Sequence, residues 1–210
     1  MGDLSSLRVT VAGVGVFGLA SALTLARRGA LVTVVDPALE GGNASSVAAG
    51  MLAPAFEAAL DATSRGQFPL LRQARDLWPS FMADIAPGAL HRDGAVYRGG
   101  REAEQMVFER LLAEGAQAER TEAGVFASED WRIEPKAVLS AMRQELERRG
   151  VAFMPLRAQD APRGEALVLA CGFGARDLAP ELSILAPIKG QLLRFEAGPR
   201  TGPSLRGPNG

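Results

Sequence analysis

Two short runs of β-branched and other apolar residues, residues 8–12 and 31–36, flank a longer run rich in Ala and Leu, residues 19–28. Short apolar runs of this composition predict buried strands, and the Ala/Leu run predicts a helix that ends at Gly29. The pattern therefore predicts a strand, a helix and a second strand, in the order of a βαβ unit whose second strand ends in an acid.

Helical and strand patterns continue to alternate along the rest of the chain. The predicted helices cover residues 64–85, with breaks at Pro69 and Pro79, and residues 101–114 and 135–149. The predicted strands cover residues 95–97, 151–153 and 166–170. Strands that alternate with helices in this way are typical of an α/β fold with a parallel sheet.

The turn between the first strand and the helix carries a G-x-G-x-x-G motif, with glycines at Gly13, Gly15 and Gly18. In a dinucleotide site the first glycine allows the tight turn, the second lets the backbone approach the pyrophosphate, and the third lets helix and sheet pack closely. The phosphates then face the free N–H groups at the helix N-terminus. Such turns also occur for structural reasons alone, but here a preceding strand, a following helix and a later acid accompany the motif.

The acid is Asp36, which is placed to accept hydrogen bonds from a ribose 2′-hydroxyl. A simpler reading is that Asp36 is a solvated turn residue before Pro37. An acid at this position disfavours NADP, because it would repel the 2′-phosphate, but it does not separate FAD from NAD.

Composition narrows the remaining function classes. The 210 residues are 47% hydrophobic, which is enough for a buried core, and their formal net charge of -1 gives no global field that favours nucleic acid or an anionic membrane. No apolar run is long enough to span a membrane, and the start lacks the basic flank of a signal peptide, so a cytoplasmic protein is expected. The single cysteine, Cys171, is read as a buried packing residue and the single histidine, His91, as a loop residue, so no metal site is predicted.

Residues 44–54 read ASSVAAGMLAP and are followed by Glu57. This sequence resembles the signature of the glycine oxidase branch of the D-amino-acid oxidase family. Members of this branch are flavoenzymes of thiamine biosynthesis. The resemblance implies FAD as cofactor, a small amino acid or amine as substrate, hydride transfer from its Cα to the flavin, and O₂ as the electron acceptor that gives H₂O₂; a homo-oligomer is left open. The cofactor carries the redox chemistry, so no catalytic side chain is assigned. Carried over position by position, the resemblance implies cofactor contacts from Val16, Phe17, Asp36, Pro37, Ala44, Ser45, Ala49, Gly50 and Met51.

Two later segments resemble the same family. Residues 166–174 resemble its VV-x-A-x-G turn, which makes Gly172 a candidate cofactor contact. Gln159 falls about where relatives touch the adenine with a backbone group. The multi-stranded excursion that relatives carry before the strand at residues 166–170 is short or absent here.

The resemblance implies an α/β fold in which a Rossmann-like FAD-binding domain is interleaved with part of an antiparallel-sheet α+β substrate domain, whose C-terminal part is missing. The expected segments are residues 1–60 and 135–180 for the FAD-binding domain, and residues 61–134 and 181–210, with a strand at 188–195, for the substrate domain.

In the family the residues that hold the substrate carboxylate would follow Gly210, so this chain alone is expected to be inactive and poorly stable. Arg98, Arg101 and Arg132 are the alternative carboxylate-binding residues within the chain. Two other functions stay open, a membrane-associated, quinone-linked D-amino-acid dehydrogenase and a truncated, non-catalytic nucleotide-binding module.

Overall fold

The computed structural model describes residues 4–162, 164–193 and 202–208. The chain divides into two compact units. The first unit contains Met1–Ala49 and Pro135–Leu193, and the second contains Gly50–Glu134 and Arg194–Gly210. Each unit is therefore formed by two separate stretches of sequence, as the expected interleaving requires.

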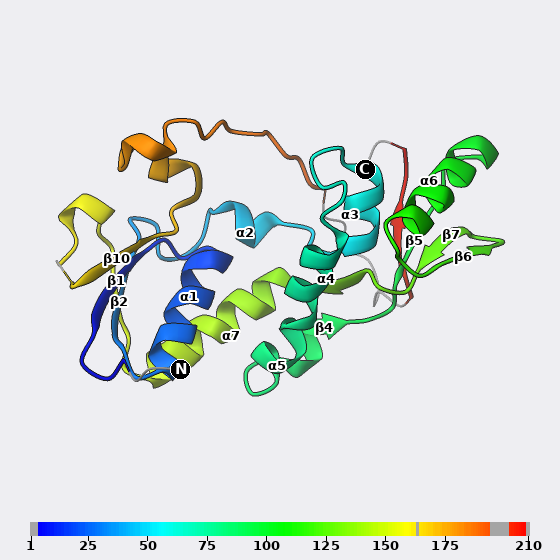
Figure 1. Cartoon of the computed structure of the whole chain (residues 1–210). Coiled ribbons are helices and arrows are strands. Elements are labelled where there is room, and N and C mark those ends of the chain that lie inside the picture. The colour runs from blue at the N-terminus through cyan, green and yellow to red at the C-terminus, as the bar shows by residue number, and fades with distance from the viewer. Residues whose placement is uncertain (1–3, 163, 194–201, 209–210) are drawn as a thin grey trace. The chain divides into compact units, whose positions relative to one another are not determined.

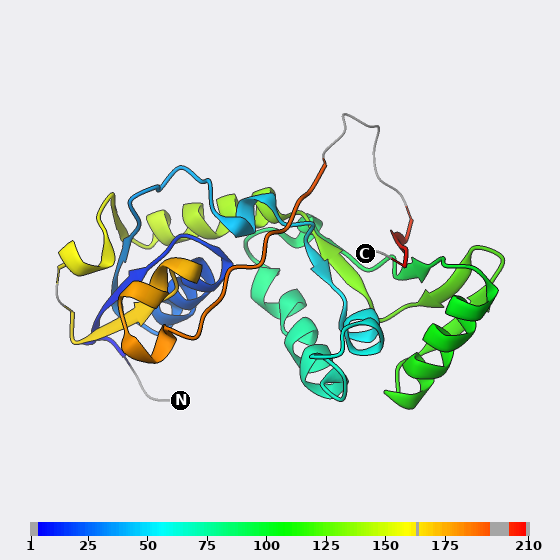
Figure 2. The ribbon, with the colours of Figure 1, turned by 90° about the horizontal axis from the view of Figure 1, so that it is seen from above.

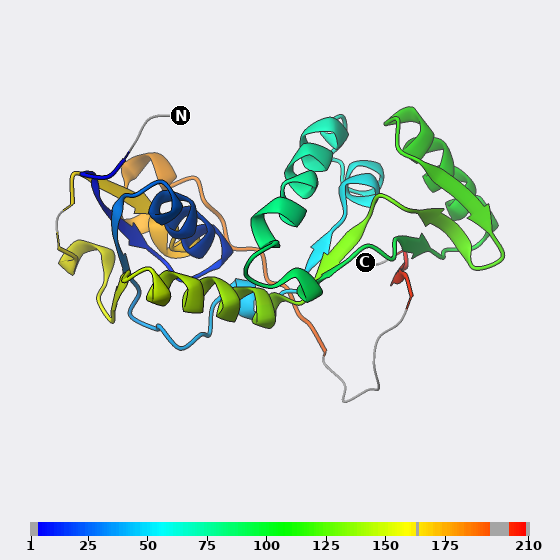
Figure 3. The same ribbon diagram turned by 90° about the horizontal axis from the view of Figure 1, so that it is seen from below.

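The first unit is built on a four-stranded, fully parallel sheet with strand order β10-β1-β2-β9. Its strands are β1 (Arg8–Ala12), β2 (Leu31–Val35), β9 (Ala152–Met154) and β10 (Ala166–Leu169). The helices α1 (Val16–Arg27) and α7 (Pro135–Arg148) lie side by side against this sheet (Figures 1 and 3). The predicted βαβ unit and the two later strands are confirmed.

The core of this unit explains why the opening segment folds as it does. Val11 and Val34 on adjacent strands are fully buried, as is Leu23 on α1. Burial of such a side chain contributes roughly 1.5–3 kcal/mol. Gly29, at φ +88°, ends the helix in the left-handed conformation and directs the chain into β2.

A short connection, residues 155–162, follows β9 and contains the 3-10 turn η2 (Ala158–Asp160). The Thr10 hydroxyl on β1 donates a hydrogen bond of 2.8 Å to the carbonyl oxygen of Pro162. This contact holds the connection against the sheet, on the side away from α1 (Figures 1 and 2). The predicted shortness of this region is confirmed.

The second unit contains a four-stranded sheet and a three-stranded sheet. The first has the order β11-β5-β7-β6, and the second has the order β3-β8-β4. The strands are β3 (Met51–Leu52), β4 (Leu90–His91), β5 (Ala95–Tyr97), β6 (Ala118–Thr121), β7 (Gly124–Ala127), β8 (Trp131–Ile133) and β11 (Ser204–Arg206). The helices are α3 (Pro54–Leu60), α4 (Phe68–Asp76), α5 (Trp78–Met82) and α6 (Arg101–Ala113). The strand pairs are antiparallel, as expected, except for the parallel pair of β11 and β5.

Two local expectations are corrected. Ile188–Leu193, the described part of the predicted strand at residues 188–195, adopts no regular structure, because these residues pair with no neighbouring strand; residues 194 and 195 lie outside the described residues. His91 is a residue of β4 rather than of a loop, since it pairs with Arg132 of β8. Among the described helices, none combines the length and the apolar character that a membrane span needs.

Candidate functional site

The turn from β1 into α1 is fixed by close backbone contacts. Gly13 has a φ of +118°, and its N–H donates to the carbonyl oxygen of Val35 at 2.8 Å. A Cβ at Gly13 would lie 2.3 Å from the carbonyl oxygen of Ala170, and one at Gly18 would lie 1.9 Å from that of Gly13. Only glycine therefore fits at these two positions, for the reasons that the motif predicts.

Gly15 differs from its two neighbours in the motif. It precedes α1 in an extended conformation, with φ −73° and ψ 179°, and an added Cβ would meet only the Ser45 Oγ, at 3.2 Å. The backbone here is thus open on the side where a pyrophosphate is expected to approach.

The first turn of α1 presents N–H groups to this open space. The Val16 N–H donates to the Ser45 Oγ at 3.0 Å. The N–H groups of Phe17 and Gly18 have no hydrogen-bond partner among the described residues. Unpaired N–H groups at the positive end of a helix dipole are the donors that a phosphate group requires.

Asp36 follows β2 directly and its carboxylate is held by backbone groups. Its Oδ2 accepts from the Val14 N–H at 3.1 Å, and its Oδ1 accepts from the Ala38 N–H at 2.8 Å. Each oxygen keeps a further lone pair, so the oriented carboxylate can still accept hydrogen bonds from ribose hydroxyls.

A cavity of about 730 Å³ opens at the carboxyl edge of the parallel sheet. Its walls come from the segments that follow all four strands, among them Gly13, Asp36, Pro37, Arg157, Gln159 and Cys171. In the strand order β10-β1-β2-β9, the chain runs from β1 outward to β2 and β9 and then returns to β10 on the other side of β1, so the strand order reverses between β1 and β10. Ligands of open α/β sheets bind in the crevice at such a switch point, so the cavity lies where a dinucleotide is expected.

The other predicted cofactor contacts of the first unit include Ala44, Ser45 and Gly172, which lie at the starts of short helical turns. Ala44 and Ser45 begin the short helix α2 (Ala44–Val47), which the Asn43 side chain caps by accepting from the Ser46 N–H at 2.9 Å. Gly172 opens the 3-10 turn η3 (Gly172–Asp177) at φ +56°, while its neighbours Cys171 and Gly174 line the cavity.

The three residues expected near the flavin ring fall across the boundary of the units. Ala49 ends the first stretch of the first unit, whereas Gly50 and Met51 belong to the second unit. Gly50 accepts a hydrogen bond from the Ile133 N–H at 2.8 Å, and Met51 pairs with Arg132. Contacts of these residues with a flavin stay a prediction.

The second unit contains a group of buried charges that the sequence did not predict. Asp130 is 1% exposed, and its carboxylate accepts from the N–H groups of Ala55 and Phe56 at 2.8 and 3.2 Å, so it caps α3 from a distant part of the sequence. Burial raises the pKa of Asp130 to about 6, although the two N–H groups and the charge of Arg206 lower it. The sequence signal was the lack of a capping side chain at Ala53.

Two buried arginines of this unit are already paired. Arg132 contacts Glu134 at 2.7 Å and Asp93 at 3.5 Å, so its charge is compensated within the protein. Arg206 contacts the Glu57 carboxylate at 2.6 Å and the Met51 Sδ at 3.4 Å. Because Arg132 already pairs with these two carboxylates, it is poorly suited to bind a substrate carboxylate.

Neither the cysteine nor the histidine forms a reactive centre among the described residues. Burial raises the pKa of the Cys171 thiol, which disfavours the thiolate. The His91 Nε2 lies 3.6 Å from Glu134. The described ranges contain no group of three or more His, Cys, Asp or Glu residues that could hold a metal ion.

The parallel sheet, the glycine turn and Asp36 together define a dinucleotide-binding protein of the α/β class. The family model of the FAD dependent oxidoreductases matches residues 8–209, and the chain belongs to this family. The prediction of FAD as cofactor, in place of NAD, is thereby confirmed, and the open backbone at Gly15 fits the pyrophosphate of such a group.

Similar proteins support the same family. The chain is 31% identical over 157 residues to a putative thiamine biosynthesis oxidoreductase, ThiO, of Rhizobium etli, which covers 67% of this chain and 46% of that protein. A glycine oxidase from Geobacillus kaustophilus has a TM-score of 0.67 at 22% identity and covers 85% of this chain and 59% of its own. An iminodiacetate oxidase from Chelativorans has a TM-score of 0.67 at 17% identity, with 83% and 57% covered. The chain thus spans about half the length of these relatives, and the last two likenesses concern the fold.

Proposed function

We propose that the protein catalyses the FAD-dependent oxidative deamination of a small amine or amino acid, such as glycine, sarcosine or D-alanine, with O₂ reduced to H₂O₂. The observation that carries the proposal is the cavity where the glycine turn and Asp36 meet at the sheet edge. The names of the Rhizobium and Geobacillus relatives support the substrate class and a place in thiamine biosynthesis.

The residues of the first unit take distinct roles in this proposal. The N–H groups at the start of α1 bind the pyrophosphate, and the Asp36 carboxylate accepts hydrogen bonds from the ribose. A bound flavin would supply the redox chemistry by accepting a hydride from the substrate Cα. Ala49, Gly50 and Met51 contact the flavin ring, Gln159 contacts the adenine end, and Gly172 is a further cofactor contact.

The two units correspond to the two expected domains. We assign FAD binding to the first unit and substrate binding to the second, which moves the first domain boundary from residue 60 to Ala49 and the last from residue 180 to Leu193. A cytoplasmic location and a homo-oligomer stay predictions, which fractionation of cells and sedimentation of the purified protein test.

The cofactor assignment is tested by an absorbance spectrum and by cofactor extraction. Gly15→Val is expected to abolish FAD binding, because a branched side chain would fill the space through which the backbone meets the pyrophosphate. Since an added Cβ at Gly15 meets only the Ser45 Oγ, the variant should still fold, with a circular dichroism spectrum like that of the wild type. Full flavin occupancy in Gly15→Val would show that the turn is structural.

The reaction is tested by H₂O₂ production from glycine, sarcosine and D-alanine with added FAD. Residues 1–210 are compared with the protein made with its downstream reading frame, and O₂ consumption is compared with quinone reduction. H₂O₂ release by the longer protein supports the proposal. Quinone reduction without H₂O₂ would identify the dehydrogenase instead, and turnover by residues 1–210 alone would place the carboxylate clamp within this chain.

A further inference from the structure

At the carboxyl edge of the parallel sheet, the segments that could bind the parts of a nucleotide follow neighbouring strands. The N–H groups of α1 follow β1, Asp36 follows β2, and residues 155–162 follow β9. Adjacent strands lie about 4.8 Å apart, so the end of β9 is roughly 10 Å from the end of β1. If the pyrophosphate is bound at α1 and the ribose at Asp36, the segment after β9 faces the adenine.

Arg157 is the charged residue of this segment that lines the cavity, and the lining also contains Ala158, Gln159 and Pro37. Its side chain is exposed and makes no hydrogen bond or ion pair with any residue that the structure describes. The backbone around it is held in place, because the Arg157 carbonyl accepts from the Asp160 N–H at 3.0 Å and Pro162 is bonded to Thr10.

Two carboxylates line the same cavity, Asp36 and Asp177, and neither forms an ion pair with the Arg157 guanidinium in the described part of the chain. Both Asp36 oxygens accept from backbone N–H groups. The phosphate donors at α1 lie two strands away. An unpaired planar guanidinium in the part of the cavity that is expected to hold the adenine is suited to contact the face of this aromatic ring.

We propose that Arg157 is a further nucleotide-binding residue, whose guanidinium stacks on the adenine ring and so favours flavins that carry adenosine over FMN. This inference rests on the proposed function, because it requires an adenine nucleotide in the cavity. It gives the short connection after β9 a role in cofactor selection.

The test measures the affinities of FAD, ADP and FMN for the purified, cofactor-free protein by calorimetry and flavin fluorescence. Arg157→Ala is expected to weaken FAD and ADP binding by about threefold to thirtyfold and to leave FMN binding unchanged. Arg157→Lys keeps the positive charge but lacks the planar guanidinium group, so it should restore only part of the affinity.

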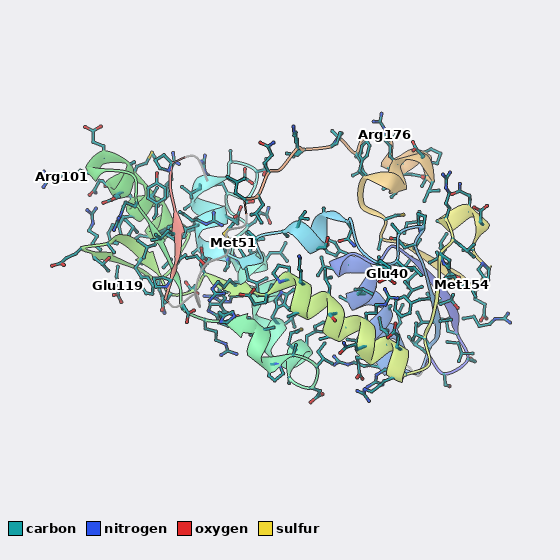
Figure 4. The ribbon with its side chains drawn as sticks, turned by 180° about the vertical axis from the view of Figure 1, so that it is seen from behind. Glu40, Met51, Arg101, Glu119, Met154 and Arg176 are labelled. Carbon is teal, nitrogen blue, oxygen red and sulfur yellow. The ribbon has the colours of Figure 1, made fainter. Side chains whose placement is uncertain are left out.

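Arg176→Ala is the matched control. Arg176 is an exposed arginine of η3 that packs over the Phe173 ring at 5.9 Å and is absent from the described cavity lining (Figure 4). It should bind all three ligands as the wild type does. Wild-type affinity of Arg157→Ala for ADP would overturn the inference while the proposed function stands. A wild-type protein that binds neither FAD nor ADP would overturn both.

Discussion

The two units position their polar groups in different ways. In the first unit Asp36 and Arg157 line the cavity, and the N–H groups of Phe17 and Gly18 at the start of α1 have no partner among the described residues. Close packing of glycines fixes the turn before this helix. In the second unit, charged side chains such as Asp130 and Arg206 are themselves buried, at 1% and 8% exposure, and hold elements together. A site that a ligand must enter keeps donors open, whereas a supporting cluster satisfies its charges internally. Substitutions in the two units should therefore affect different properties.

The largest effect is expected for Gly13→Ala in the first unit. The added methyl would overlap the Ala170 carbonyl oxygen, and the φ of +118° is strained for alanine. We expect the free energy of unfolding to fall by about 3–5 kcal/mol, measured by urea denaturation. Gly42→Ala is the matched control, because Gly42 also has a positive φ but no atom near its Cβ position. An equal loss in both variants would show that backbone strain, and not close packing, makes glycine necessary at Gly13.

Asp130→Ala tests the second unit and should lower the free energy of unfolding by about 2–4 kcal/mol. The substitution leaves the N–H groups of Ala55 and Phe56 without their acceptor inside the protein. Urea unfolding at about pH 4, where the contribution of this carboxyl group is complete, measures the effect. FAD affinity per folded molecule should remain unchanged. A loss of FAD affinity without a loss of stability would contradict the supporting role of this residue.

The same carboxyl group gives a pH dependence of known sign. Burial raises the pKa of Asp130 from 3.8 to about 6, so between these values the folded state binds more protons than the unfolded state. The contribution of this group to the free energy of unfolding is complete below about pH 4 and is lost as the pH rises to about 6, by about 3 kcal/mol. Asp130→Asn should remove this slope between pH 4 and pH 7. An unchanged slope in the variant would assign it to other groups.

The strands, turn and helix at the start of the first unit could be predicted because the residues that determine them lie close together in the sequence. The strand, turn and helix around Gly13 and Gly18 lie within one short segment, and each residue type has a single geometric reason to be there. Asp130 escaped prediction because its partners, Ala55 and Phe56, are more than 70 positions away in sequence. The cavity wall at Arg157 was missed for a similar reason. Its place in the same cavity as Pro37 depends on the pairing of β9 with β2, which lie far apart in the sequence.

Asp36→Ala tests whether the first unit acts on cofactor affinity. Loss of an ionised acceptor for the ribose hydroxyls should weaken FAD binding by about 1.5–3 kcal/mol. Glu40→Ala is the control, since this carboxylate is 94% exposed and contacts only Arg143 among the described residues, at 3.6 Å (Figure 4). We expect Glu40→Ala to change the affinity by less than about 0.5 kcal/mol. Equal effects would indicate that the general charge of the loop matters, and not a specific contact with the ribose.

The smallest effect is expected for Ser45→Ala. The hydroxyl is neutral and accepts from the Val16 N–H, so its loss removes one hydrogen bond at the edge of the proposed pyrophosphate site. If the hydroxyl also donates to a phosphate oxygen, FAD affinity should fall by about 0.5–1.5 kcal/mol, less than for the ionised Asp36. Ser46→Ala serves as the control, because the Ser46 hydroxyl donates instead to the carbonyl oxygen of Asn43, the residue before α2. Titration of the cofactor-free proteins with FAD measures both variants. Tighter binding by Ser45→Ala would mean that the hydroxyl only competes with the phosphate for the Val16 N–H, and its assignment as a cofactor contact would be wrong.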